Sequence, residues 1–450
     1  MTSLETRPLV GRRHPRPDLG SSALPSVPPQ YAADFDIAIV GLGYVGLPTA
    51  LAYHHAGARV LGLEISPQRI STIRSGDADL LDSDRARLTE ALRDPRFALT
   101  DDPAMLRRAT AVIVCVPTPV DHHLVPDLTM LRSACDSVVA NAVSDQILML
   151  TSTSYVGCTD DLLVTPLVER GFTPGRNISV AFSPERIDPG NDAYEHESVP
   201  RVIGGATPSC EMRASAVLSR YTARVHRVES LAAAEMTKLL ENTFRAVNIA
   251  LANEVADICR ELDVPVIEVI DAAATKPYGF MPFLPGPGVG GHCIPCDPHY
   301  LLWQLRERRV AAPMITQAMS EIAARPARVV ERAAQVLSDA GHGLGGARVL
   351  VVGVSYKPDV ADLRESPALE IIHGLERRGA IVEYLDPLCP QARMLDGRVT
   401  ETVRDPLGFA PDLVVIHTRH RELDLSWIDE RHLVLDASYR ELAVPRRVTL

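Results

Sequence analysis

The sequence predicts an α/β protein in which two parallel-sheet domains are joined by a domain built on one long helix. Three observations predict this architecture. Short apolar, β-branched runs alternate with helical stretches between about residues 35 and 225. The stretch 231–262 then contains neither Gly nor Pro, and a second series of strand-like runs begins at Ala347.

The first sheet domain begins with an apolar strand at Ile37–Val40 that runs into Gly41-Leu42-Gly43-Tyr44-Val45-Gly46. A helix to about Ala56 and a strand at Val60–Leu63 complete a βαβ unit, which requires parallel strands. Further strands are predicted at Ala111–Val116, Ile147–Leu150 and Ile178–Ala181. Residues 1–30, which are rich in Pro, Arg and Ser and show no periodicity, are expected to form a disordered tail.

The middle of the chain shows a different pattern. Within 231–262 the apolar residues recur at helical spacing, at Met236, Leu239, Leu240, Phe244, Val247, Leu251, Val255 and Ile258. A helix of this length usually spans a molecule or forms a subunit interface, so we expect a homodimer built on it. The Gly- and Pro-rich stretch from Pro277 to Gly291 is expected to be an irregular loop.

The second sheet domain repeats the first strand-to-loop junction. Val352-Gly353-Val354-Ser355-Tyr356 matches Val40-Gly41-Leu42-Gly43-Tyr44 but lacks the middle glycine. Strands are predicted at Ile381–Leu385, Leu413–Ile416 and Leu433–Leu435. We therefore expect four segments: a tail (1–30), a nucleotide-type domain (31–225), a central helical domain (226–325) and a second nucleotide-type domain (326–450). Open α/β sheets bind ligands at the carboxyl ends of their strands, so two ligands should meet in one cleft.

Composition excludes several classes of partner. The 450 residues carry a formal net charge of −11, with a pI near 5.7, whereas nucleic acids and anionic membranes need basic surfaces. No apolar run approaches the roughly 20 residues of a membrane span. The N-terminus lacks the apolar core of a secretory signal, so we expect a cytosolic protein whose cysteines are thiols.

The first glycine motif predicts a dinucleotide site, because a strand precedes it and a helix follows. Gly41 permits the tight turn, Gly43 lets the backbone approach a pyrophosphate, and Gly46 allows close packing of helix and strand. Glu64 lies 21 residues after Gly43 (64 − 43) at the end of the second strand. A carboxylate there suits a free ribose 2′-hydroxyl, so NAD is favoured over NADP and over a purely structural glycine turn.

Cys293 ends the glycine loop, next to His292, where an exposed thiolate close to backbone amides could act as a nucleophile. Cys293 and Cys296 also form a CxxC pair, which is compatible with redox activity or with half of a zinc site. Since a structural zinc needs four ligands and the chain has one such pair, we predict no metal. For Cys296 the sequence favours simple burial.

Two further groups of residues remain ambiguous by spacing alone. Lys238 and Asn242 are four residues apart and share one helix face, where they could stabilise an oxyanion or simply meet solvent. Glu185, in Ser183-Pro184-Glu185-Arg186 after a strand, is either a general base or a surface carboxylate in a turn.

Taken together, these motifs resemble the UDP-glucose/GDP-mannose dehydrogenase family, and most of all its bacterial UDP-N-acetylglucosamine 6-dehydrogenases. The resemblance extends from Asp34 to the C-terminus. The motifs that carry it are GLGYVGLP (41–48), CVPTP (115–119), FSPERIDPGN (182–191), PRVIGG (200–205), AEMTKLLENTFRAVNIALANE (234–254), PGPGVGGHCIPCDP (285–298) and YKPDVADLRESPALEI (356–371).

The resemblance implies Rossmann domains at both ends, the second binding a UDP-sugar, and a four-electron oxidation of the sugar C6 alcohol by NAD through a cysteine thiohemiacetal and thioester. It implies that Cys293 is the nucleophile, that Lys238 and Asn242 stabilise the oxyanion, and that Glu185, Asp297 and Thr153 handle protons and water. The implied cofactor contacts are Gly41, Gly43, Tyr44, Val45, Gly46, Glu64, Arg69, Pro117 and Thr118. The implied substrate contacts are Arg186, Phe283, Gly288, Gly290, Gly291, Lys357 and Arg364.

The sequence departs from the family pattern at Thr151, where bacterial members often have an acidic residue, and at Cys296, which could trap Cys293 as a disulfide. Three alternatives are carried forward: a UDP-glucose 6-dehydrogenase, a UDP-sugar-binding paralogue without activity, and a two-electron hydroxyacid dehydrogenase. The last would need neither the cysteine nor the second nucleotide domain.

Overall fold

The computed structural model describes residues 33–80, 82–186, 196–291, 294–440 and 444–450. The predicted tail at 1–30 and the residues His292 and Cys293 lie outside this description. None of the helices in the described residues is long and apolar enough to cross a membrane.

The N-terminal domain contains an eight-stranded sheet in the order β3-β2-β1-β4-β5-β6-β7-β8, in which the β6–β7 pair alone is antiparallel. Its strands are β1 (Phe35–Val40), β2 (Val60–Leu63), β3 (Phe97–Thr100), β4 (Ala109–Val114), β5 (Ile147–Leu150), β6 (Ser179–Phe182), β7 (Arg201–Gly205) and β8 (Val225–Val228). Its helices are α1 (Gly46–His55), α2 (Pro67–Ser75), α3 (Asp82–Ala91), α4 (Thr129–Asn141), α5 (Thr165–Glu169) and α6 (Pro208–Leu218), with short turns η1 (Pro103–Arg108), η2 (Asp160–Val164) and η3 (His196–Ser198).

Alternation along each strand divides the apolar side chains of this sheet between two layers. Ile37 and Ile39 of β1 join the layer of α1, α3 and α6, whereas Ala38 and Val40 join that of α4 and α5. Helices therefore cover both faces, as the continuous apolar strands predict. The carboxyl ends of β1, β4 and β5 align, with Val40 paired to Val114 and Val114 to Leu150.

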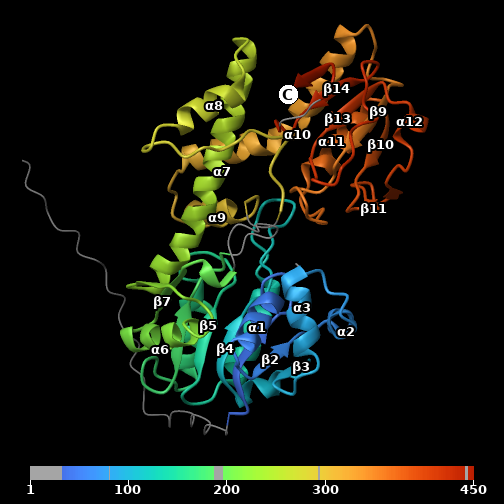
Figure 1. Cartoon of the computed structure of the whole chain (residues 1–450). Helices are drawn as coiled ribbons and strands as arrows, with labels where there is room; N and C mark the ends of the chain where they lie inside the picture. Colours follow the sequence, from blue (N-terminus) through green and yellow to red (C-terminus); the bar gives the residue numbers. More distant parts are fainter. Residues whose placement is uncertain (1–32, 81, 187–195, 292–293, 441–443) are drawn as a thin grey trace, which may run out of the picture.

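The central region is built on α7 (Leu231–Glu261), which rises from the N-terminal domain past the level of α9 (Figure 1). It is followed by α8 (Val266–Ala274), α9 (Asp297–Glu307) and α10 (Pro313–Asp339). The helix α10, whose interior contains Pro326, was not predicted from the sequence. The first part of α10 packs on α7 through Met319 and Ile322, and its last part enters the core of the C-terminal sheet.

The C-terminal domain contains a fully parallel sheet in the order β10-β9-β13-β14-β15. Its strands are β9 (Arg348–Val352), β10 (Ile381–Leu385), β13 (Leu413–Ile416), β14 (Leu433–Asp436) and β15 (Arg447–Thr449), with a small hairpin of β11 (Gln391–Arg393) and β12 (Val399–Glu401) and helices α11 (Pro367–Arg377) and α12 (Pro406–Phe409). The predicted two sheet domains and long central helix are thus confirmed.

Candidate active site

In the glycine loop after β1, Gly41 and Gly46 are closely packed, whereas Gly43 faces open space. Gly41 has φ +88°, and a Cβ there would lie 2.9 Å from the carbonyl oxygen of Cys115. A Cβ at Gly46 would overlap the carbonyl oxygen of Gly41, whereas a Cβ at Gly43 would meet no atom within 4 Å. The open position is the one that the glycine pattern reserves for a pyrophosphate.

The carboxylate of Glu64 lies beside this loop. Its two oxygens accept hydrogen bonds from the backbone amides of Leu42 (2.9 Å) and Ser66 (2.9 Å). Arg69 donates from Nε to the carbonyl oxygen of Leu42 at 2.9 Å, which ties the loop to α2. Val45 precedes α1, and no side chain caps that helix. An uncapped helix start, an open glycine and a carboxylate at the end of β2 fit a dinucleotide with a free ribose hydroxyl.

The loop after β4 contributes Pro117, which is exposed, and Thr118, which is buried. The carbonyl oxygen of Thr118 accepts a hydrogen bond from the hydroxyl of Tyr300 at 3.1 Å. Because Tyr300 belongs to α9, this contact joins the expected cofactor side of the sheet to the helix that begins at Asp297.

Four of the predicted catalytic residues lie where α7 passes the carboxyl end of β6. The ammonium of Lys238 donates to the carbonyl oxygen of Glu185 at 2.8 Å, and the amide nitrogen of Asn242 donates to a carboxylate oxygen of Asp297. Asp297 is the first residue of α9. The four-residue spacing on α7 therefore places Lys238 and Asn242 on the same side, facing the two carboxyl-bearing residues. The predicted nucleophile Cys293 and its neighbour His292 lie outside the described residues.

Asp297 has an unusual protonation equilibrium because it is 3% exposed. Burial raises its pKa to about 6, although the charge of Lys238 and the hydrogen bond from Asn242 act in the opposite direction. A carboxyl group with a pKa near neutrality can both take up and release a proton under physiological conditions.

The remaining predicted residues of this region lie around the cluster. Arg186 forms an ion pair with Glu241 of α7 and donates to the carbonyl oxygen of Pro200 at 2.9 Å. Thr153 is half-buried in the loop after β5. The ring of Phe283 meets that of Phe244 edge to face, with centroids 5.8 Å apart.

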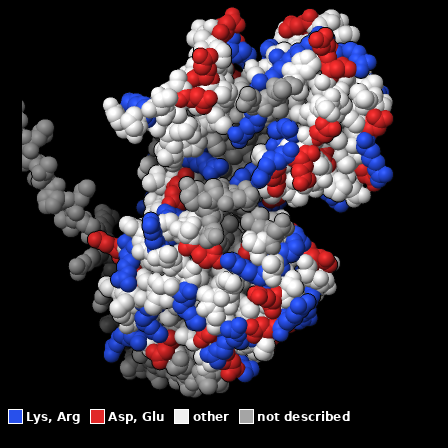
Figure 2. All heavy atoms as spheres, in the orientation of Figure 1, with Lys and Arg blue, Asp and Glu red and all other residues white. Residues whose placement is uncertain are grey.

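The loop that leads to Cys293 rests on the C-terminal domain. A Cβ at Gly290 would lie 2.5 Å from Cβ of Tyr356, and a Cβ at Gly288 would lie 2.7 Å from the ring of Pro367. The amide of Gly291 donates to the carbonyl oxygen of Arg364 at 3.0 Å. The half-buried Lys357 belongs to the same C-terminal segment. On the face drawn in Figure 2, Lys and Arg side chains gather where the upper part of the molecule faces the N-terminal domain, although the chain is acidic overall.

The second glycine turn, after β9, has a carboxylate in the place of Glu64 but a buried side chain in the place of Gly43. Asp386 follows β10 as Glu64 follows β2, and it accepts a hydrogen bond from the amide of Val354 at 2.7 Å, as Glu64 does from Leu42. Ser355, which stands in the place of Gly43, is fully buried and has its hydroxyl 3.1 Å from His420. The position that is open in the first turn is therefore filled in the second, so the two sheets cannot bind phosphate in the same way.

Three buried charged residues with partners around the site were not predicted from the sequence. Arg201 of β7 pairs with Glu185, Glu235 of α7 accepts three hydrogen bonds from Gly157 and Thr159, and Arg325 of α10 joins Asp257 to the carbonyl oxygen of Gly286. Each interrupts an otherwise apolar or helical pattern, which is the one local signal that could have found them.

Three family models match the chain in order: the NAD binding domain of the UDP-glucose/GDP-mannose dehydrogenase family at residues 35–222, its central domain at 232–322 and its UDP binding domain at 350–439. The chain is 33% identical over 392 residues to the UDP-N-acetyl-D-glucosamine 6-dehydrogenase of Pseudomonas aeruginosa, covering 86% of this chain and 91% of that protein. It is 32% identical over 400 residues to the UDP-N-acetyl-D-mannosamine dehydrogenase of Salmonella typhi, covering 86% and 94%.

The solved structure of UDP-D-ManNAc dehydrogenase from Pyrococcus horikoshii has a TM-score of 0.83 and 30% identity to this chain, covering 92% of this chain and 98% of that one. The predicted family, the predicted fold class and the predicted NAD-binding domain are confirmed by these matches. Three domains in the family's order, and similarity along most of the chain, show that the protein belongs to the UDP-glucose/GDP-mannose dehydrogenase family and is an NAD-dependent nucleotide-sugar dehydrogenase.

Proposed function

We propose that the protein oxidises the C6 hydroxymethyl group of UDP-N-acetylglucosamine or UDP-N-acetylmannosamine to a carboxylate, in cytoplasmic polysaccharide biosynthesis. The names of the relatives from Pseudomonas aeruginosa and Salmonella typhi support this choice of sugar. The observation that carries the chemistry is the convergence of Lys238, Asn242, Glu185 and Asp297 where α7 and α9 meet the end of β6.

In this proposal the Cys293 thiolate adds to the C6 aldehyde and forms a thiohemiacetal, whose oxidation yields a thioester. Lys238 and Asn242 donate hydrogen bonds to the oxygen that becomes negative in these steps. Water then attacks the thioester, its oxygen–carbon bond forms as the carbon–sulfur bond breaks, and Thr153 helps to order that water. Bound NAD supplies the hydride acceptor for both oxidations.

The ligand contacts are proposed as follows. The cofactor is held by the loop and strand-end residues Gly41, Gly43, Tyr44, Val45, Gly46, Glu64, Arg69, Pro117 and Thr118. The nucleotide sugar is held by Arg186, Phe283, Gly288, Gly290, Gly291, Lys357 and Arg364. The open position at Gly43 supports the first set. The close approach of Gly290 to Tyr356 and of Gly288 to Pro367, in the loop that leads to Cys293, supports the second set.

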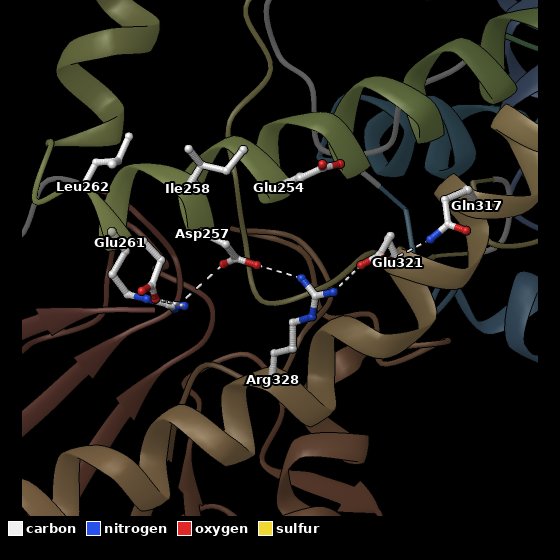
Figure 3. A pocket seen from close by; sticks show the side chains of 9 residues that line it. Glu254, Asp257, Ile258, Glu261, Leu262, Gln317, Glu321 and Arg328 are labelled. Atoms are coloured by element: carbon white, nitrogen blue, oxygen red, sulfur yellow. Dashed lines mark hydrogen bonds and ion pairs between the residues drawn. The ribbon is translucent and has the colours of Figure 1, made fainter.

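We also propose a homodimer formed along α7, because an apolar stripe of this helix is exposed in the single chain. It consists of Met236, Leu240, Phe244, Leu251, Ile258 and Leu262. The stripe ends in a groove of about 520 Å³ between α7 and α10 (Figure 3), lined by Glu254, Asp257, Ile258, Arg260, Glu261, Leu262, Gln317, Glu321 and Arg328. Burying such a stripe against a second copy is favourable by about 25 cal/mol per Å².

For the domains, we propose the divisions 31–225, 226–325 and 326–450. The helix α10 runs across the last of these boundaries, so we expect the central and C-terminal parts to unfold together.

The decisive experiment counts NADH per sugar with UDP-N-acetylglucosamine, UDP-N-acetylmannosamine, UDP-glucose and UDP-galactose. About two NADH per sugar with either N-acetylated substrate is expected for a four-electron route through a thioester. One NADH per sugar would show that oxidation stops at the aldehyde. Turnover of UDP-glucose alone would move the assignment to a UDP-glucose 6-dehydrogenase. No turnover of any of the four, in a protein that still binds a UDP-sugar, would favour the inactive paralogue.

A further inference from the structure

Arg201, the first residue of β7, is 2% exposed and points toward the carboxylate of Glu185. One of its terminal nitrogens, Nη1, lies 2.5 Å from Oε1 of Glu185. The same carboxylate oxygen accepts a hydrogen bond from the backbone amide of Arg186 at 2.7 Å. Two donors therefore converge on one oxygen and fix the carboxylate just after the end of β6, while Lys238 donates to the main-chain carbonyl oxygen of the same residue.

The groups around this pair cannot replace Glu185 as the partner of Arg201. The nearby titratable side chains include Tyr53 of α1, Cys115 after β4, Tyr221 after α6 and Lys238 of α7. Glu197 of η3 also acts on Tyr221, but it is paired with Arg87 at 2.7 Å. Burial raises the pKa of both phenols and raises that of Cys115 to about 12, so these groups stay protonated near neutrality. A buried guanidinium without a counterion is costly, and Glu185 is the carboxylate that pairs with it in the described part of the chain.

The second carboxyl group of the site has different surroundings. Asp297 receives a neutral amide hydrogen bond from Asn242, and the cation near it, Lys238, is engaged with the carbonyl oxygen of Glu185. Another titratable neighbour is Tyr300, whose pKa is raised by burial. Glu185 is thus paired with a guanidinium, whereas Asp297 is paired with a neutral amide, and carboxyl groups in such different surroundings can take different roles in catalysis.

We propose that Arg201 is a positioning residue that keeps Glu185 ionised and fixed as a hydrogen-bond acceptor for the hydrolytic water, which leaves Asp297 to take the proton. This rests on the proposed function. When the oxygen of water bonds to the thioester carbon, the carbon–sulfur bond breaks, the thiolate leaves, and the water proton passes to Asp297.

The first test measures kcat against pH in the wild type and in Glu185→Gln. The acid limb of the wild type belongs to Asp297 and is expected near pH 6. In Glu185→Gln the rate should fall while the acid limb keeps its position. Loss of the acid limb in Glu185→Gln would overturn the proposal, because Glu185 would then be the group that titrates.

The second test removes the guanidinium. In Arg201→Gln the pKa of Glu185 should rise toward neutrality, because its buried carboxyl group loses its counterion. Less of it is then ionised at pH 6 than at pH 8, so the ratio of the rates at pH 8 and pH 6 should rise about threefold or more over the wild type. Arg201→Lys keeps a cation and should keep the acid limb in place, even if its rate is lower. The matched control is Arg227→Gln, which removes the ion pair between the exposed Arg227 of the neighbouring strand β8 and Glu211 of α6, and it should leave the profile unchanged. Superimposable profiles for Arg201→Gln and Arg227→Gln would contradict the proposal, as would a shifted limb in Arg201→Lys.

A third measurement needs no turnover and separates this inference from the proposed function. Infrared difference spectra between the wild type and Glu185→Gln, taken at pH 5 and pH 8, should contain a carboxylate band at both values. A protonated carboxyl band at pH 5 would overturn the role of Arg201. Absence of NADH formation with every UDP-sugar would count against the proposed function alone.

Discussion

The guanidinium carbon of Arg364 lies 3.9 Å from the ring centroid of Tyr44, which joins the glycine loop of the N-terminal domain to the C-terminal domain. Arg364 is also paired with Asp362 at 2.6 Å, and its carbonyl oxygen accepts the amide of Gly291 at 3.0 Å. Arg364 thus contacts both the loop proposed to bind NAD and the loop that leads to Cys293. A change in this residue or in Tyr44 can therefore affect both proposed ligand sites.

This contact predicts that Tyr44→Ala weakens the binding of both NAD and the UDP-sugar. A partly exposed cation–π contact contributes about 0.5–1 kcal/mol, so KM for NAD and for the UDP-sugar should each rise about two- to fivefold. Steady-state kinetics with each substrate varied in turn measures this. Tyr44→Phe keeps the ring and should stay near the wild type. A rise in KM for NAD only would mean that the contact does not connect the sites.

Gly43 and Gly46 should respond oppositely to the same substitution. A methyl group at Gly43 meets open space, so Gly43→Ala should keep the melting temperature but weaken NAD binding roughly tenfold or more, because the methyl group occupies the proposed pyrophosphate position. A methyl group at Gly46 overlaps backbone, so Gly46→Ala should lower the free energy of unfolding by at least about 2 kcal/mol. Thermal unfolding and NAD titration of both variants check this, and unchanged NAD affinity in Gly43→Ala would remove the assignment.

Asp297 should make the protein less stable at neutral pH than at mildly acidic pH. Its pKa in the folded state is raised from 3.8 to about 6, so the folded state binds more protons between these values, and this contribution to stability is lost as pH rises through 6. Asp297→Asn should therefore raise the free energy of unfolding at pH 8 by up to about 3 kcal/mol while kcat collapses. Denaturant unfolding at pH 4 and pH 8 measures this; the gain should vanish at pH 4. A destabilised variant at pH 8 would show that the charge of Asp297 is compensated in the native site.

The exposed stripe of α7 predicts a dimer that two charged substitutions in the stripe disrupt. Leu240 and Leu251 are 58% and 55% exposed in the single chain, and each would be buried twice in a two-fold interface. Light scattering should give twice the 48.9 kDa of one chain for the wild type and one chain mass for the double variant Leu240→Glu/Leu251→Glu. Leu407→Glu, at a comparably exposed leucine of α12, is the control and should stay dimeric. A monomeric wild type would refute the interface.

Much of the secondary structure could be predicted because it depends on local patterns. The helix expected at 231–262 is α7 at Leu231–Glu261, and the strands expected at Val60–Leu63 and Ile381–Leu385 have those bounds. Apolar periodicity and the absence of Gly and Pro are properties of neighbouring residues, so no tertiary information was needed. The helix α10 escaped prediction although its first turn begins favourably at Pro313, since tertiary packing against α7 and the C-terminal core holds a helix with a proline inside it.

The sequence by itself determined the order of the domains, the glycine loop and Glu64, and the four-residue spacing of Lys238 and Asn242, because each of these depends on residues close together in the chain. Only the tertiary structure decided that Lys238 contacts Glu185 across 53 residues, that Arg201 pairs with the same Glu185, and that Arg364 stacks on Tyr44. It also decided the raised pKa of Asp297. The physical reason is that burial and charge pairing depend on which distant segments the folded chain brings together, and no local pattern records that.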